Sequence, residues 1–367
     1  MTGAATTAKH GAAPHTAIRR SERARDAVRH HPRLAFAATL AVVAALAIAA
    51  VGLGSVAIPP DQTIAIVVHR LLGIDLGVAR SAATEAIVWE LRIPRVLTAA
   101  TVGVALAVAG ATFQGLLRNP LADPYVLGTA SGAGLGAAVA LILPIRVVVA
   151  QFGLLHLLAF VGALGAMTAV YRLSRLSAWS GMTNLLLTGY AVGSLLAAGL
   201  AMAMYLSGAS LREIFAFLLG GFERSSWIRL ALAAPLIALG SVAILVRARA
   251  LNGLLLGEEA AAHLGVDVPR ERVILLALGS LVTAAAVAVS GLIGFVGLVV
   301  PHVVRLVVGP NARVVLPLSA GVGAALLIAA DLGARLLGDI PVGVVTAIVG
   351  APFFLALLRR AQSGYEL

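Results

Sequence analysis

The chain has 367 residues, of which 60% are hydrophobic and only 12% are charged. A soluble domain carries about 25% charged residues, so the composition argues against a soluble all-α protein. The formal net charge is +11, which in such an apolar chain indicates a charge bias across a membrane rather than a nucleic-acid partner.

Two residue types limit the chemistry that the chain can perform. Cysteine is absent, which excludes disulfides, thiolate metal sites and cysteine nucleophiles. Lys9 is the only lysine, whereas a Walker A motif needs a lysine inside a glycine-rich phosphate loop. If ATP drives this protein, we therefore expect another chain to hydrolyse it.

The chain begins with a basic tail. In residues 1–33, Lys and Arg outnumber the two acidic residues, Glu22 and Asp26, which predicts a disordered cytoplasmic segment. Arg19-Arg20 is not followed by an apolar stretch, which argues against an export signal. Residues 361–367 are predicted to form a short second cytoplasmic tail.

Between the tails, residues 34–360 are predicted to form the membrane domain. Apolar runs of about 20 residues, the length that crosses a bilayer, recur along it. They predict ten transmembrane helices, at 34–56, 95–116, 124–143, 147–170, 185–206, 228–246, 273–289, 293–307, 315–333 and 342–358. Residues 59–90 mix charged with apolar residues and predict an extramembrane segment with a short surface helix. The predicted fold class is therefore an all-α polytopic membrane protein.

Ten helices place both termini on one side of the membrane. Lys and Arg are more frequent in the segments on that side, which favours cytoplasmic termini. Most of this excess lies in residues 1–33, so several arginines on the opposite, outer side need a separate explanation.

The loop between the sixth and seventh predicted helices, about 251–270, holds an acidic, alanine-rich stretch. Its two glutamates favour a helix N-terminus through the helix dipole, its alanines make a slim helix, and a glycine ends it. This pattern predicts a short docking helix, with an ordinary amphipathic loop helix as the alternative. The candidate coupling residues are Gly257, Glu258, Glu259, Ala260, Ala261 and Gly265.

Asp331 lies inside the ninth predicted helix, where a charge costs about 2.5–3.5 kcal/mol on insertion scales. Arg335 lies four residues later on the same helix face, so we interpret the two as an ion pair rather than as part of a proton relay. His302 is interpreted as a packed or hydrogen-bonded group. The histidines show no metal-site spacing, and no metal bound by the protein itself is expected.

Several long segments carry a family resemblance. They are Leu91–Arg95 (LRIPR), Gly110–Gly128 (GATFQGLLRNPLADPYVLG), Leu219–Phe222 (LGGF), Gly257–Gly265, Gly294–His302 (GFVGLVVPH), and Pro341–Ala347 (PVGVVTA) running into Gly350–Pro352 (GAP). In these segments the chain resembles the FecCD-type permeases of iron-siderophore and vitamin B12 ABC importers, over nearly its whole membrane region. The stretch from Glu259 to Gly265 is similar to the EAA…G coupling pattern of binding-protein-dependent ABC permeases.

The resemblance implies a dimer of ten-helix subunits like that of the vitamin B12 importer, with the transport pathway at the dimer interface. The second permease subunit would be a copy of this chain or a paralogue. Two cytoplasmic ATP-binding subunits would dock on the loops at 257–265 and use the ATP, so this chain would hold no cofactor. A substrate-binding protein would dock on the outer face.

The resemblance also assigns two further sets of residues. Outer arginines that meet acidic residues of the binding protein correspond to Arg92, Arg95 and Arg335; a guanidinium bonds carboxylates bidentately, and snorkelling to lipid headgroups is the alternative. The cytoplasmic gate corresponds to Asn119, Leu121, Met182 and Thr183. Met182 departs from the small hydroxyl residues of the family, and plain loops are the alternative there.

These observations predict a non-enzymatic permease subunit of an ABC importer in the cell membrane. Ferric siderophores are the expected cargo, with vitamin B12 and haem as alternatives. An ion-coupled secondary transporter would need intramembrane charges, for which Asp331 is the one candidate. A membrane-embedded enzyme would need reactive side chains that the sequence does not offer at motif spacing.

Overall fold

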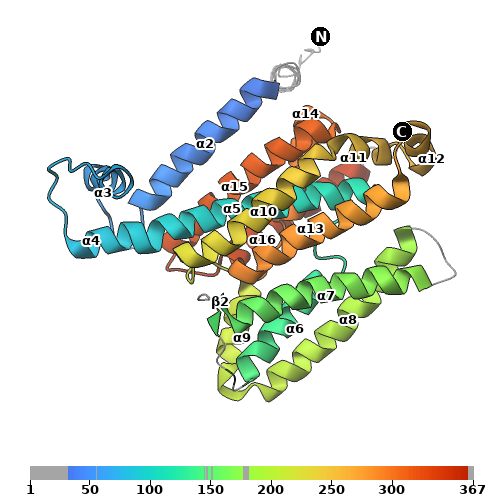
Figure 1. Ribbon diagram of the computed structural model, residues 1–367, viewed down its shortest axis with the longest axis horizontal. Helices are drawn as coiled ribbons and strands as arrows, with labels where there is room; N and C mark the ends of the chain where they lie inside the picture. The colour runs from blue at the N-terminus through green and yellow to red at the C-terminus, as the bar shows by residue number, and fades with distance from the viewer. Residues whose placement is uncertain are drawn as a thin grey trace, which may run out of the picture.

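The structure is a computed structural model that describes residues 32–54, 56–143, 145, 148–149, 152–176 and 182–362. This part of the chain is almost entirely helical (Figure 1). Its one piece of sheet is an antiparallel pair, β1 (Val148–Val149) and β2 (Phe152–Gly153). Of the predicted tails, only residues 32–33 and 361–362 are described, and they belong to the first and last helices; the remaining tail residues lie outside the described ranges.

Seven helices in the described ranges are long and apolar enough to cross a membrane. They are α2 (Pro32–Gly52), α5 (Ile93–Leu116), α7 (Leu154–Leu176), α8 (Met182–Leu206), α10 (Trp227–Val246), α13 (Val268–Ser290) and α15 (Ala312–Leu336). Three further apolar helices are α6 (Thr129–Ile142), α14 (Val296–Val308) and α16 (Val342–Gln362). Each of the ten predicted ranges overlaps one of these helices, so the prediction of an all-α polytopic membrane protein is confirmed.

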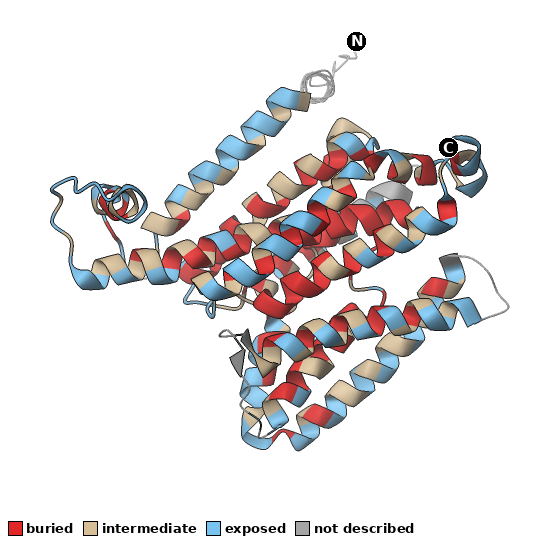
Figure 2. Ribbon diagram, viewed as in Figure 1, coloured by how far each residue is buried: buried red, intermediate tan, exposed pale blue. Residues whose placement is uncertain are grey.

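The helix α5 is the most deeply buried span, and α13, α14 and α15 pack around it (Figures 1 and 2). Glycines set the spacing between these helices. A Cβ added at Gly103 would lie 2.2 Å from the carbonyl oxygen of Gly323 in α15, and one added at Gly110 would lie 1.9 Å from that of Gly297 in α14. Such close packing holds helices together in lipid, where the hydrophobic effect cannot.

A second group of helices lies beside this core and consists of α6, α7, α8 and the short α9 (Leu211–Leu219), which follows the 3₁₀ turn η2 (Gly208–Ser210) (Figure 1). The helices α2 and α8 are the least buried spans (Figure 2). Because both are apolar along their exposed faces, they are suited to face lipid or another subunit.

The residues that precede α5 differ from the prediction. Among them, α3 (Pro60–Leu72) is the expected short helix, and Figure 1 shows it end-on where α2 and α5 lie lengthwise. Residues 82–92 are helical and not separate from the next span: α4 (Ala82–Ala86) and a π-helical stretch, η1 (Ile87–Arg92), continue directly into α5. Arg92 interrupts the apolar run in the sequence, but in the structure its side chain is buried and bonded to backbone carbonyls.

Two predicted helices begin too early. The helix α6 begins at Thr129 rather than 124. The side chains of Asn119 and Asp123 accept hydrogen bonds from the backbone N–H groups of Leu121 (2.9 Å) and Tyr125 (2.8 Å), and these bonds fold residues 117–128 into turns. Similarly, α7 begins at Leu154 rather than 147, after the β1–β2 pair.

The helices α11 (Ala248–Leu255) and α12 (Glu258–His263) join α10 to α13. They lie at the opposite end of the molecule from α3 and α4 (Figure 1). The two ends are called the α12 end and the α3 end below.

Candidate functional site

The predicted docking helix is present as α12. Gly257, with φ 115°, precedes it and Gly265, with φ 79°, follows it; both conformations favour glycine. Glu258 and Glu259 occupy the first turn, where the helix dipole favours them. The structure thus places the six candidate coupling residues in or directly beside one short helix, while their role in coupling stays a prediction.

Three contacts fix α12 to the rest of the α12 end. Ala261 is fully buried and lies against Gly253 of α11. Glu258 forms an ion pair with Arg272 of α13. The backbone N–H of Val266 donates to the carbonyl of Ala261 at 3.0 Å. The helix is therefore packed against α11 and linked to α13 rather than a free loop.

An open recess of about 590 Å³ lies between α11, the segment after α12, and the first turns of α13 and α15. Arg249, Arg270 and Asp267 are among the charged residues that line it. Leu256 and Leu264 also line it, and they are 69% and 66% exposed. Exposed leucines beside charges of both signs are typical of a surface that another protein covers.

Sequence reasoning missed the pair of asparagines that positions α11. The Asn252 side chain donates to Asn311 Oδ1 at 2.9 Å and accepts the N–H of Ala312 at 2.7 Å. Asn311 also caps α15 by accepting the N–H of Arg313 at 3.1 Å. Asn311 follows Gly-Pro and precedes an apolar run, which is an N-cap signal that could have identified it from the sequence.

The three arginines predicted to meet a binding protein lie together at the α3 end and face inward. Arg92 is 6% exposed and donates to the carbonyls of Val51 and Gly52, both at 2.9 Å, and to that of Val56. It therefore satisfies carbonyl groups that the C-terminal end of α2 leaves unpaired. This arrangement neither tests nor contradicts a docking role, which stays a prediction.

The other two arginines share Asp331. The expected pair of Asp331 with Arg335 is confirmed at 3.2 Å. Arg95, which is 236 positions away from Asp331, also bonds this carboxylate at 2.8 Å. Arg95 further contacts Asp339 at 3.4 Å, and Arg335 donates to the Leu53 carbonyl at 3.2 Å. The ends of α2, α5 and α15 are thus joined by one buried polar cluster.

The predicted gate residues fall at helix ends. Asn119 is half-buried and holds the turn after α5, while Leu121 is 41% exposed. Thr183 is exposed in the first turn of α8. Met182 begins α8, but its side chain lies outside the described residues. No observation tests their gating role.

A second buried polar group, which the sequence analysis did not identify, joins α14 to α5. Arg305 donates to Gln114 Oε1 and, at 3.0 Å, to the Ala111 carbonyl. Gln114 in turn donates to the Leu298 carbonyl at 3.0 Å. The signal that could have found this group is the arginine itself, inside an apolar run of membrane-spanning length.

No group of three or more His, Asp or Glu side chains that could hold a metal ion occurs in the part of the chain that the structure describes. His302 is half-buried within α14.

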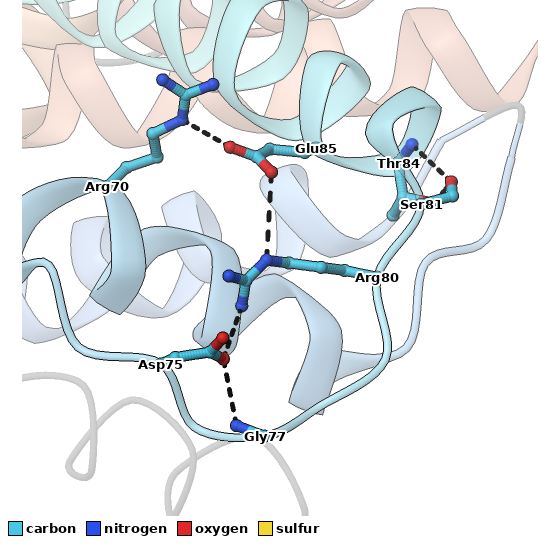
Figure 3. A network of polar contacts seen from close by, with 7 residues as sticks. All are labelled: Arg70, Asp75, Gly77, Arg80, Ser81, Thr84 and Glu85. Atoms are coloured by element: carbon cyan, nitrogen blue, oxygen red, sulfur yellow. Dashed lines mark hydrogen bonds and ion pairs between the residues drawn. The ribbon is translucent and has the colours of Figure 1, made fainter.

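The connection between α3 and α4 is held by a chain of ion pairs (Figure 3). Glu85 pairs with Arg70 at 2.6 Å and with Arg80 at 3.9 Å, and Arg80 pairs with Asp75 at 3.1 Å. The N–H of Gly77 and the guanidinium of Arg80 both donate to Asp75 and hold the pKa of its carboxyl below its usual value. Exposed pairs of this kind stabilise little, so their main effect is to order this connection.

With the fold and these sites described, the comparisons with known proteins identify the family. The sequence profile of the FecCD transport family matches residues 41–360. The chain belongs to the FecCD transport family. This places it among the permease subunits of ABC importers in the cell membrane, which act with an ATPase and a binding protein and are not themselves enzymes.

Curated relatives of the chain are permeases with different printed cargoes. The chain is 46% identical to the cobalamin import system permease protein BtuC of Halobacterium salinarum, over 79% of this chain and 77% of that protein. It is 41% identical to the hemin transport system permease protein HmuU of Yersinia pestis, over 75% of this chain and 84% of that protein. An uncharacterised ABC transporter permease of Bacillus subtilis, YvrB, is 42% identical over 86% and 90%.

Among solved structures, an inward-facing conformation of a metal-chelate type ABC transporter matches with a TM-score of 0.75 and 30% identity. The match covers 90% of this chain and 99% of that one. The predicted family and its fold are thereby confirmed.

Proposed function

We propose that this chain is the transmembrane permease of an importer for large metal chelates, with ferric siderophores as the cargo expected from the sequence. The observation that carries the permease function is the α11–α12 module, which presents an exposed helix and a recess at one end of a bundle of the FecCD family. The structural relative of metal-chelate type supports a chelate as cargo. Vitamin B12 and haem are the second candidates, favoured by the cobalamin and hemin permeases among the relatives.

Transport by the assembled complex tests this function. The chain would be reconstituted into liposomes with its ATPase and binding protein, and uptake of a ferric siderophore, cobalamin or haem would be measured. We expect ATP-dependent uptake of one chelate class and none when the ATPase carries a substitution that abolishes hydrolysis. Uptake that persists with the inactive ATPase would contradict a function as an ABC permease.

The cargo itself is tested on the cognate binding protein. Saturable binding of one class among ferric siderophores, cobalamin and haem would assign it. Binding of bare metal ions, with none of the three chelates, would contradict a chelate importer.

The ATPase is proposed to dock at the α12 end, which together with both termini would face the cytoplasm. Gly257, Ala260, Ala261 and Gly265 shape α12, and Glu258 and Glu259 begin it. The exposed leucines of the recess would be covered by the ATPase. Two ATP-binding subunits would serve two permease subunits, which are either two copies of this chain or a copy and a paralogue, with the pathway between them.

Leu256→Asp is expected to weaken the complex with the ATPase about tenfold or more. Burial of a leucine stabilises an interface by roughly 1.5–3 kcal/mol, and 1.4 kcal/mol is about a factor of ten. Co-purification with the ATPase and substrate-stimulated ATP hydrolysis measure the effect. Leu76→Asp, in the exposed connection at the α3 end, is the control for co-purification with the ATPase and should not change it. Equal behaviour of the two variants would exclude the recess as the docking site.

The binding protein is proposed to dock at the α3 end through the cluster of Arg92, Arg95 and Arg335. Arg92 and Arg335 would shape this surface, because both hold backbone carbonyls of the α2 end. Arg95 would make the direct contact, because one of its partners, Asp339, lies at the surface. The gate at the cytoplasmic end is proposed to consist of Asn119, Leu121, Met182 and Thr183.

A further inference from the structure

Arg95 uses its hydrogen-bonding groups unevenly. Its Nε donates to Asp331 Oδ1 at 2.8 Å, which is a short, charge-assisted hydrogen bond. Its Nη1 contacts Asp339 Oδ1 at 3.4 Å, close to the limit for a hydrogen bond. Its Nη2 is buried and has no hydrogen-bond partner among the described residues. Nη1 is therefore only loosely occupied, and Nη2 is unoccupied but buried.

The two carboxylates that face Arg95 differ in how firmly they are held. Asp331 is 1% exposed, lies inside α15 and also pairs with Arg335. The side chain of Asp339 is 51% exposed and lies in the connection between α15 and α16. A long, exposed ion pair of this kind contributes little and is screened by salt. Asp339 can thus leave Arg95 at small cost, whereas Asp331 cannot.

We propose that Asp339 occupies the position that an acidic side chain of the binding protein takes on Arg95, and that docking exchanges one carboxylate for the other. The incoming carboxylate would bond Nη1 and Nη2 together, in the bidentate geometry that a guanidinium favours. Asp331 would keep Nε and hold the fork in place. This exchange rests on the proposed docking of the binding protein at the α3 end.

The exchange has a consequence for affinity. While Asp339 faces Arg95, it lowers the net charge of the cluster of three arginines and two aspartates from +2 to +1. A binding protein must then compete with a carboxylate that is tethered to the same site, which lowers its affinity and speeds its release. Removal of Asp339 should therefore strengthen docking, although the residue belongs to the docking surface.

Asp339→Asn is expected to lower the Kd for the binding protein about twofold to fivefold, the fold-change that corresponds to the loss of one exposed, competing ion pair. The measurement uses the full transporter in lipid nanodiscs and the purified binding protein, at two salt concentrations. Asp75→Asn is the matched control. It removes an exposed carboxylate at the same end, 64% exposed, that pairs with Arg80 instead.

Any loss of negative charge at the α3 end favours binding of an acidic partner. Only an increase in affinity larger than that of Asp75→Asn therefore supports the exchange. The gain should also vanish when Arg95 is replaced by Gln. If Arg95→Gln does not fold, Arg95→Lys keeps the charge but removes the fork.

The outcomes distinguish docking at Arg95 from the exchange of carboxylates. Unchanged binding by the Arg95 variant would exclude docking at Arg95 and the exchange with it. Weaker binding by the Arg95 variant, together with equal effects of Asp339→Asn and Asp75→Asn, would leave docking in place and overturn the exchange. Weaker binding by Asp339→Asn would also overturn it, because Asp339 would then assist docking.

Discussion

Asp331→Asn is expected to lower the free energy of unfolding by about 3–5 kcal/mol, because it removes the anion between two buried guanidinium groups. Asp331 is 1% exposed, and its oxygens face Arg95 at 2.8 Å and Arg335 at 3.2 Å. Asparagine keeps the shape and one acceptor oxygen but not the charge. Arg95 would then face only one carboxylate, that of the half-exposed Asp339, and Arg335 would lose its nearest carboxylate.

Unfolding of the purified protein in mixed detergent micelles with increasing SDS measures this loss. Asp75→Asn is again the control, since its carboxylate is exposed and surface changes usually alter stability by less than about 0.5 kcal/mol. If the two variants unfold at the same SDS fraction, the Asp331 cluster does not stabilise the fold.

The membrane-length helices could be predicted from the sequence because a bilayer leaves the backbone few alternatives to a helix. The predicted ends failed where side chains far from the apolar pattern decide them. Asn119 and Asp123 delay the start of α6 by satisfying backbone N–H groups in turns. At Arg92 the polar side chain that interrupts the apolar run donates hydrogen bonds to carbonyls at and just after the end of α2, 36 to 41 positions away.

The candidate sites follow the same division between local and distant interactions. The docking helix could be predicted because its signals, two glutamates, alanines and flanking glycines, act within one turn. The pair of Asp331 with Arg335 could be predicted because i,i+4 residues share a helix face. The bond from Arg95 to Asp331 and the pair of Asn252 with Asn311 could not, because only the packed fold brings these residues together.

Distant contacts also connect the α12 end to the centre of the bundle. A Cβ added at Gly115 of α5 would lie 2.7 Å from the Leu251 side chain of α11. The preceding residue, Gln114, bonds both Arg305 and the Leu298 carbonyl of α14. We therefore expect that a displacement of α11 by a docked ATPase would also displace α5 and α14.

Gly110→Ala is expected to lower the free energy of unfolding by about 3 kcal/mol, at the upper end of the usual range for overpacking. Its new methyl group would lie 1.9 Å from the Gly297 carbonyl oxygen, and backbone cannot give way as a flexible side chain can. The helices α5 and α14 would have to separate. That separation would also strain the bonds of Gln114, one turn further along α5.

Gly165→Ala in α7 is the matched control, because it makes the same change inside a helix where no atom beyond the helix's own local backbone lies within 4 Å of the new methyl group. It should be neutral, or stabilising by roughly 0.5–1 kcal/mol through the better helix propensity of alanine. Unfolding in SDS and transport in liposomes measure both variants. Because α5 and α14 connect the α12 end to the centre of the bundle, transport should fall at least as far as folded protein is lost. Wild-type stability of Gly110→Ala would show that α5 and α14 do not pack backbone to backbone.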